Sequence, residues 1–283
     1  MKHILVIGAN GQLGQSLRHI ADQFPDFSMR FMGRSECDLQ DPIQMAQVFK
    51  KHTIDICINA AAYTAVDQAE KEPDLAYAIN ARGTEDLAKL CAAHQVTLAH
   101  ISTDYVFDGK ATLPYDEQAP TAPIGVYGKS KWQGEQAVKE HLAQYYIIRT
   151  SWLYGPFGHN FLTTMLRLAD QNKALTITTE QTGVPTSSID LARAILGIIA
   201  HGSTPYGLYH FSNEGPTTWY GFAQEIFTQS GQIETTQLAS TEYYPTFAER
   251  PKYSVLDNEK FKTTLEIPVR HWREALVEVM TLL

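Results

Sequence analysis

Short apolar runs alternate with amphipathic stretches over the first half of the chain, which is the pattern of βαβ units. The apolar runs predict strands at residues 2–7, 28–32, 54–59, 97–102 and 145–150. The amphipathic stretches predict helices at 12–22, 42–51, 74–94 and 126–141. Asp41 as a cap and Pro42 in the first turn mark the start of the second helix. Together these elements predict an α/β fold with a doubly wound parallel sheet, Rossmann-like in architecture.

The alternation weakens after about residue 151, at a loop that holds Gly155, Pro156 and Gly158. Helical patterns follow at 189–200 and 219–230, among scattered short strands. We therefore predict a dinucleotide-binding domain over 1–151 and a smaller α/β substrate-binding lobe over 152–283, with some elements interleaved. Parallel crossovers bring the carboxyl ends of the strands to one edge of the sheet, where site residues are expected.

Three glycines, Gly8, Gly11 and Gly14, lie between the first predicted strand and the first predicted helix. In that context glycines let the backbone turn tightly and approach a pyrophosphate at the helix N-terminus. A plain glycine-rich βα turn would look the same, and the spacing departs from the common G-x-G-x-x-G. The alanines at 60–62 would let a dinucleotide lie over the end of the third strand, although tight packing explains them equally well.

Tyr127 and Lys131 lie four residues apart in a predicted helix, so they share one helix face. Bringing a phenol from a pKa of about 10 to about 7 requires about 4 kcal/mol. One positive charge at about 4 Å supplies about that much at an effective dielectric near 20. The pair therefore suits general acid–base catalysis, and Thr103, just after the fourth predicted strand, would place a hydroxyl nearby. Taken alone, the same spacing also fits a surface helix with a solvated lysine, and the backbone could satisfy Thr103.

Charge, hydropathy and cysteine content narrow the expected partners and compartment. The formal net charge is -8 with no run rich in Lys or Arg, so nucleic acid is not expected. No stretch approaches the roughly 20 apolar residues that cross a membrane, and the first apolar run is too short for a signal peptide. Cys37, Cys57 and Cys91 lack the spacing of a metal site, so they predict reduced thiols in a cytoplasmic protein.

The end of the second predicted strand bears on the choice between NADPH and NADH. Sites that prefer NADH usually place an Asp or Glu there, to bind the adenosine ribose hydroxyls. Here the strand runs into Arg34 and Ser35, which can instead hold a 2′-phosphate. We therefore expect NADPH, with NADH also usable, unless Arg34 is a solvated charge and Glu36 or Asp38 reaches the ribose.

Four segments carry a resemblance to a known family: STDYVFDG at 102–109, RTSWLYG at 149–155, QTGVPT at 181–186 and Arg250-Pro251. With the glycine loop and the Tyr127–Lys131 pair, they make nearly the whole chain similar to the extended short-chain dehydrogenase/reductase family. The resemblance implies an NAD(P)H-dependent oxidoreductase that transfers hydride to the C4 keto group of a dTDP-linked 6-deoxy sugar. The implied reaction converts dTDP-4-dehydrorhamnose to dTDP-rhamnose, a building block of cell-surface polysaccharide.

The resemblance also implies roles for individual residues, alongside those argued above. In the expected catalytic triad, Tyr127 protonates the alkoxide, Lys131 holds the nicotinamide ribose and tunes the phenol, and Thr103 orients the carbonyl. Cofactor contacts are expected from Gly8, Gly11, Gln12, Leu13, Gly14, Arg34, Ser35, Asp38, Leu39, Ala60, Ala61, Ala62, Tyr63, Thr64, Tyr127 and Lys131. Substrate contacts are expected from Thr103, Asp104, Trp152, Asn160 and Arg250. Trp152 could equally be core packing, whereas the Arg250 guanidinium suits a diphosphate and Pro251 fixes its turn.

Other functions on this fold stay open. Related 4,6-dehydratases place an Asp-Glu pair after the strand hydroxyl, whereas this chain has Asp104-Tyr105, which disfavours elimination. A nucleotide-sugar epimerase would use the same tyrosine and lysine, and a non-catalytic regulatory subunit of the methionine adenosyltransferase type would keep only the fold. Some family members dimerise through a metal held by glutamates near the first helix. Residues 14–17 contain no glutamate here, so we expect no metal, while a homodimer stays open.

Overall fold

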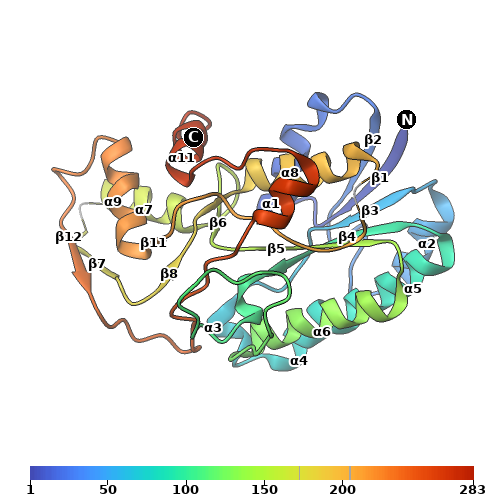
Figure 1. Ribbon diagram of the computed structural model, residues 1–283, viewed down its shortest axis with the longest axis horizontal. Coiled ribbons are helices and arrows are strands. Elements are labelled where there is room, and N and C mark those ends of the chain that lie inside the picture. The colour runs from blue at the N-terminus through green and yellow to red at the C-terminus, as the bar shows by residue number, and fades with distance from the viewer. Residues whose placement is uncertain (172, 204) are drawn as a thin grey trace.

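A parallel sheet forms the centre of the larger part of the molecule (Figure 1). The computed structural model describes residues 1–171, 173–203 and 205–283. In those ranges the sheet has six strands in the order β10-β5-β4-β3-β1-β2, and all neighbouring pairs are parallel. The strands are β1 (Lys2–Ile7), β2 (Phe27–Met32), β3 (Ile56–Asn59), β4 (Thr97–Thr103), β5 (Tyr145–Thr150) and β10 (Gly207–His210). The strand order reverses between β1 and β3, which confirms the predicted doubly wound α/β fold.

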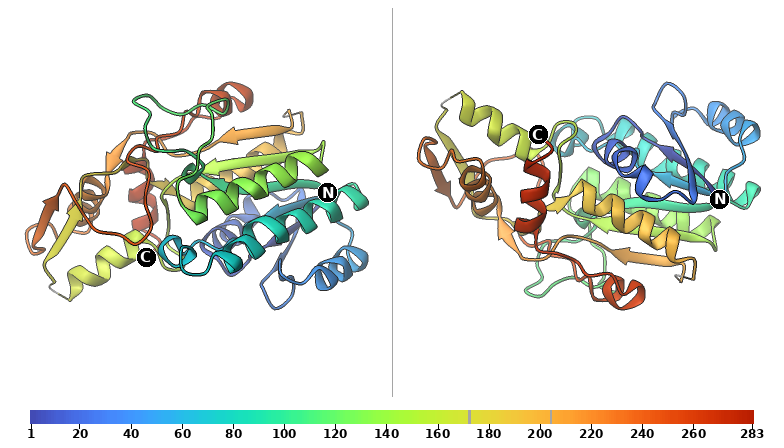
Figure 2. Two further views of the ribbon diagram at one scale, coloured as in Figure 1. Left: turned by 90° about the horizontal axis from the view of Figure 1, so that it is seen from below. Right: turned by 90° about the horizontal axis from the view of Figure 1, so that it is seen from above.

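Helices cover both faces of this sheet (Figure 2). One face carries α1 (Gln12–His19) and α8 (Ser188–His201), and the other carries α2 (Pro42–Lys51), α5 (Thr84–His94) and α6 (Val126–His141). The pleat of β1 divides the two cores, because Ile4 and Val6 pack on the α1 side while Leu5 and Ile7 pack on the α2 side. All four side chains are buried, as expected for a parallel sheet covered on both faces.

The helix predicted over 74–94 is interrupted in the structure. After α3 (Val66–Ala69), the chain forms α4 (Pro73–Tyr77), a π-helical turn over Ala78–Gly83, and then α5. The π-helical turn contains the buried Asn80. Its Oδ1 accepts from the Tyr63 N–H (2.8 Å), and its Nδ2 donates to the Tyr63 carbonyl (3.0 Å). The same Nδ2 donates to Ser130 Oγ on α6 (3.1 Å). The wider turn therefore ties the loop after β3 to α6. The helix predicted over 12–22 is also shorter, because α1 ends at His19 and a 3₁₀ turn over Ala21–Gln23 follows.

A smaller lobe lies beyond the carboxyl ends of the sheet strands (left in Figure 1). Its core packs α7 (Phe161–Asp170), α9 (Trp219–Gln229) and α11 (Trp272–Met280) around the fully buried Phe222 and Trp272. Short strand pairs complete it: β7 (Leu175–Thr178) with β12 (Leu238–Thr241), β8 (Thr182–Gly183) with β11 (Thr217–Thr218), and β6 (Leu153–Tyr154) with β9 (Thr186–Ser187). The helices predicted at 189–200 and 219–230 correspond to α8 and α9, whereas the sequence pattern does not predict α7 or α11.

Part of the second half of the chain returns to the sheet layer. α8 packs on α1, and β10 pairs with β5 from Gly207↔Tyr146 to His210↔Arg149. α10 (Glu259–Leu265) adds Phe261 to the same core. We therefore propose the domain boundary after residue 151 with one amendment, namely that α8, β10 and α10 belong to the sheet layer. Within the described ranges, no helix has the length and apolarity needed to cross a membrane.

Candidate active site

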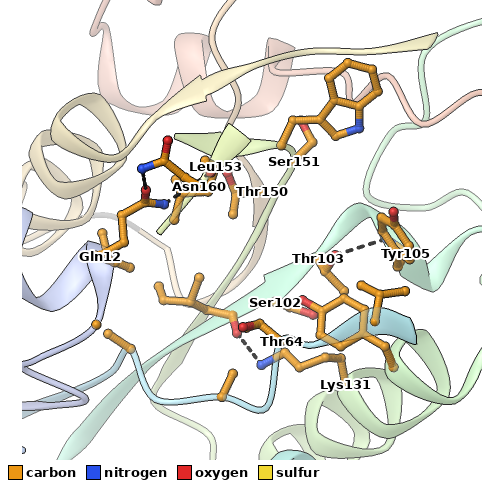
Figure 3. A pocket seen from close by; sticks show the side chains of 18 of the residues that line it. Gln12, Thr64, Ser102, Thr103, Tyr105, Lys131, Thr150, Ser151, Leu153 and Asn160 are labelled. Atoms are coloured by element: carbon orange, nitrogen blue, oxygen red, sulfur yellow. Dashed lines mark hydrogen bonds between the residues drawn. The ribbon is translucent and has the colours of Figure 1, made fainter. Parts of the chain in front are cut away.

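A cavity of about 560 Å³ opens where β1, β3, β4 and β5 end, facing the lobe (Figure 3). Its walls bring together most of the residues expected at the site: Gly11, Gln12, Leu13, Ala60, Ala61, Ala62, Thr64, Thr103, Asp104, Tyr127, Lys131, Trp152 and Asn160. A smaller hollow of about 260 Å³ shares part of this wall and extends to Gly8, Arg34, Asp38 and Leu39. Four expected residues line neither space: Gly14, Ser35, Tyr63 and Arg250.

The glycine loop is shaped by close backbone packing. Gly8 has a φ of +84°, and a Cβ built on it would lie 2.6 Å from the Ala61 backbone nitrogen. A Cβ on Gly14 would overlap the Gly8 carbonyl oxygen. Gly11 is the N-cap of α1, and no side chain in the described chain caps this helix. Since the first-turn residues Gln12 and Leu13 line the cavity, the amide end of α1 is available to a negatively charged group.

Three residues of the expected triad meet at one wall of the cavity. Thr103 ends β4, while Tyr127 and Lys131 lie about one turn apart on α6. The Tyr127 phenol lies near the Thr103 hydroxyl, which donates to Asp104 Oδ1 (3.0 Å). Tyr105 packs edge-on against the Tyr127 ring, with 5.5 Å between centroids. A carbonyl oxygen beside Thr103 would therefore meet both a hydroxyl and a phenol.

Burial controls the protonation of the tyrosine and the lysine. Burial raises the pKa of the Tyr127 phenol to about 12, although the nearby Thr103 hydroxyl opposes the rise. The expectation that Lys131 brings this pKa near 7 is not met in this conformation, because the Lys131 amino group points to other partners. Its Nζ donates to the Ile101 carbonyl (2.6 Å) and lies 3.3 Å from His100 Nε2. Burial also lowers the pKa of Lys131 to about 8. At neutral pH the phenol keeps its proton, as a general acid requires.

Asp104 lines the cavity and has one buried carboxylate oxygen without a hydrogen-bond partner. The side chain is buried, and its Oδ1 is hydrogen-bonded by Thr103. Its Oδ2 has no hydrogen-bond partner among the described residues. Burial raises the pKa of this carboxyl to about 6, and the nearby hydroxyls of Ser254 and Thr103 oppose the rise. A buried acceptor without a partner is suited to a ligand hydroxyl.

Trp152 lines the cavity and stacks on a second indole. The Trp152 and Trp219 rings lie 3.7 Å apart at 7° between planes, and Trp219 Nε1 donates to Gln181 Oε1 (3.0 Å). Trp152 has a φ of +44°, a left-handed backbone that non-glycine residues rarely adopt. Trp219 also lines the cavity but was not among the expected site residues. The sequence around Trp219 gives little indication of a site residue, because a large aromatic residue at the start of a helix usually packs in the core.

Asn160 and Arg250 hold more structural partners than the resemblance implies. Asn160 Nδ2 donates to Gln12 Oε1 (2.7 Å), and its Oδ1 caps α7 by accepting from the Thr163 N–H (3.1 Å). It therefore joins the glycine loop to the lobe. Arg250 forms a two-pronged ion pair with Asp67, at 2.7 Å to Oδ2 and 3.1 Å to Oδ1. A diphosphate would have to compete with this carboxylate.

The two alternatives for binding the adenosine ribose lie side by side at the smaller hollow. Arg34 Nε is 2.9 Å from Asp38 Oδ2, and its side chain is 71% exposed. Its terminal nitrogen donates to Gln40 Oε1 (2.6 Å). Arg34 is therefore exposed enough to reorient toward a phosphate. Over the same described ranges, no cluster of three His, Cys, Asp or Glu side chains could hold a metal ion.

Comparison with known proteins adds to this geometry. A family model described as the RmlD substrate binding domain matches residues 1–283. A dTDP-4-dehydrorhamnose reductase of Streptomyces griseus is 42% identical over 283 residues, covering 97% of this chain and 91% of that protein. A spore coat polysaccharide biosynthesis protein of Bacillus subtilis (strain 168) is 41% identical over 281 residues, covering 99% and 97% respectively. A solved dTDP-4-dehydrorhamnose reductase of Bacillus anthracis str. Ames, in complex with NADP, has a TM-score of 0.94 and 38% identity, with 99% of each chain covered.

Proposed function

Because this chain belongs to the family described as the RmlD substrate binding domain, we propose that it reduces the C4 keto group of a dTDP-linked 6-deoxy sugar with NADPH. The specific reaction is the conversion of dTDP-4-dehydrorhamnose to dTDP-rhamnose. The observation that carries the proposal is the meeting of Thr103, Tyr127 and Lys131 with the glycine loop around one cavity. The buried free cysteines are in keeping with a cytoplasmic enzyme.

The residues around the glycine loop fit a dinucleotide. Gly8 and Gly14 allow the tight turn, and the amide end of α1 favours a diphosphate. The hollow beside Arg34 and Asp38 would take the adenosine end, where the guanidinium supports a preference for the 2′-phosphate of NADPH. When bound, the reduced nicotinamide supplies the hydride.

Side chains of this protein would donate the proton and hold the sugar in position. Thr103 orients the keto oxygen, and Tyr127 gives its proton to that oxygen as negative charge develops on it. Hydride and proton together complete a two-electron reduction of the ketone to an alcohol. Asp104 Oδ2 accepts from a sugar hydroxyl, and the indole of Trp152 packs on the ring and excludes water.

The test follows nicotinamide absorbance with purified protein and dTDP-4-dehydrorhamnose, beside the UDP-linked analogue. We expect NADPH oxidation with the dTDP sugar, formation of dTDP-rhamnose, and loss of the reaction in Tyr127→Phe. Turnover with the UDP sugar alone would overturn the nucleotide assignment. Isomer exchange without net NADPH oxidation would indicate an epimerase, and no reaction with any 4-keto sugar nucleotide would favour a regulatory subunit.

A further inference from the structure

Three buried polar side chains form a connected row beneath the cavity. They are Asn59 on β3, His100 on β4 and Lys131 on α6, and each is at most 2% exposed. Asn59 and His100 are register partners on neighbouring strands, so their side chains lie on the same face of the sheet. Asn59 Nδ2 lies 3.2 Å from His100 Nδ1, and His100 Nε2 lies 3.3 Å from Lys131 Nζ.

The hydrogen bonds of Asn59 fix which nitrogen of His100 carries the proton. The Ala61 N–H donates to Asn59 Oδ1 (3.2 Å), so the amide oxygen faces the loop and the NH₂ group faces His100. His100 Nδ1 must therefore accept, and a neutral imidazole then carries its proton on Nε2. Burial lowers the pKa of His100 well below its usual value, so the ring is neutral.

The protonated Nε2 of His100 points at Lys131, and this contact distinguishes the two forms of the lysine. A neutral amine can accept from Nε2–H through its lone pair while donating to the Ile101 carbonyl (2.6 Å). An ammonium has no lone pair, so an N–H group would face an N–H group.

Other charged groups near Lys131 are already engaged. Glu135, one turn along α6, accepts from Arg149 of β5 (2.7 Å) and from Ser102 of β4 (2.6 Å). The Tyr127 phenol, one turn earlier on α6, is uncharged at neutral pH, because burial raises its pKa to about 12. His100 is therefore the ring that lies directly against Lys131 Nζ.

We propose that His100 is a positioning residue for Lys131: held by Asn59 as the Nε2–H tautomer, it favours the neutral amine at the Ile101 carbonyl. Gaining a proton then obliges Nζ to leave His100 and turn toward the cavity, where Tyr127 and Thr103 lie. Charging and reorientation of Lys131 thus become one event. The row begins at Ala61, in the loop expected to contact the cofactor, so a shift of that loop would reach the lysine through Asn59.

The first test is independent of catalysis. In protein labelled with ¹⁵N-histidine, the two ring nitrogens of His100 are assigned through their bonds to the backbone and followed from pH 6 to 9. We expect the neutral Nε2–H tautomer throughout. In Asn59→Asp, a carboxylate replaces the NH₂ donor, so the tautomer should change to Nδ1–H. A parent enzyme with Nδ1–H or with an imidazolium would overturn the proposal.

The second test measures the pKa of Lys131 from the fall of kcat at high pH, the alkaline limb of the profile. Of the two tests, only this one rests on the proposed function. In Asn59→Asp, His100 Nε2 becomes an acceptor for the ammonium, so the limb should move up by about one pH unit or more. The matched control is Asn59→Asp with His100→Leu, which keeps the new charge but removes the ring. Equal shifts in the two variants would overturn the role of His100, whereas a clearly smaller shift in the control supports it. Absent turnover would overturn the proposed function and leave the tautomer result to decide this inference.

Discussion

The Trp152 and Trp219 indoles lie face to face, with ring centroids 3.7 Å apart and 7° between planes. Trp152 comes from the segment after β5, and Trp219 is the first residue of α9 in the lobe. The stack therefore joins the first residue after the domain boundary to the start of α9, at the wall of the cavity. Ring stacking of this kind contributes about 0.5–1.5 kcal/mol beyond burial alone.

Replacing Trp219 should weaken sugar binding without touching the cofactor. In Trp219→Leu we expect the KM for the sugar nucleotide to rise up to roughly tenfold, because Trp152 loses its support. The dissociation constant for NADPH, measured by calorimetry, should not change. Trp219→Phe keeps an aromatic ring that can stack on Trp152, so its KM for the sugar nucleotide should rise less than that of Trp219→Leu. An unchanged sugar KM in the leucine variant would show that the pair is structural only.

Tyr127→Phe should remove the proton donor and little else. We expect kcat to fall by about 10²–10⁴-fold, since general acids contribute on that scale. Cofactor affinity should be nearly preserved. Tyr145→Phe, at the opposite end of β5 from the cavity, is the matched control and should retain parental kcat. Near-normal turnover in Tyr127→Phe would exclude the phenol as the acid.

Asp104 should make stability depend on pH. Its pKa is 3.8 ordinarily and about 6 in the folded chain, so the folded chain binds the extra proton between these values. Stability from this group is therefore greatest below pH 3.8 and falls as pH rises to 6, by about 3 kcal/mol. Asp104→Asn removes the buried charge and should be more stable than the parent at pH 8.

Urea unfolding of the parent and of Asp104→Asn at several pH values measures this difference. The gap between the two proteins should narrow as the pH approaches 4. If the parent is the more stable protein at pH 8, Asp104 has a partner that compensates its charge, and its role as a free acceptor is wrong.

Arg34 should set the preference for NADPH. In Arg34→Ala we expect the KM for NADPH to rise roughly tenfold and the KM for NADH to change little, because charge-assisted bonds to a 2′-phosphate are lost. Steady-state kinetics with both cofactors measure this. Arg167→Ala makes the same charge change on α7 and serves as the control. A parent enzyme that prefers NADH would instead assign the ribose to Asp38.

The sequence pattern was most informative where neighbours along the chain determine the structure. Asp41 begins α2 as predicted, because its Oδ1 accepts from the Gln44 N–H (2.9 Å) three residues later. The predicted bounds of β1 and β5 also match, since continuous apolar runs mark buried parallel strands. The glycines and the Tyr127–Lys131 spacing likewise depend on local geometry.

The sequence pattern did not predict features that depend on tertiary contacts. The π turn holds Asn80, whose side chain donates to Ser130 on α6, 50 residues away. Asn59 and His100 are 41 residues apart and meet only through strand register. The pKa of Tyr127 depends on burial and on where Lys131 points, and spacing alone reports neither.

β10 comes from the second half of the chain but completes the main sheet beside β5. It is the outer partner of β5, so a fragment ending at residue 151 would leave a row of unpaired amides and carbonyls beside Ile147 and Ile148. Such an open edge is a template for aggregation. The N-terminal half is therefore not an autonomous module, and a substrate lobe exchanged between relatives would have to be grafted as separate segments before α8, between β10 and α10, and after α10.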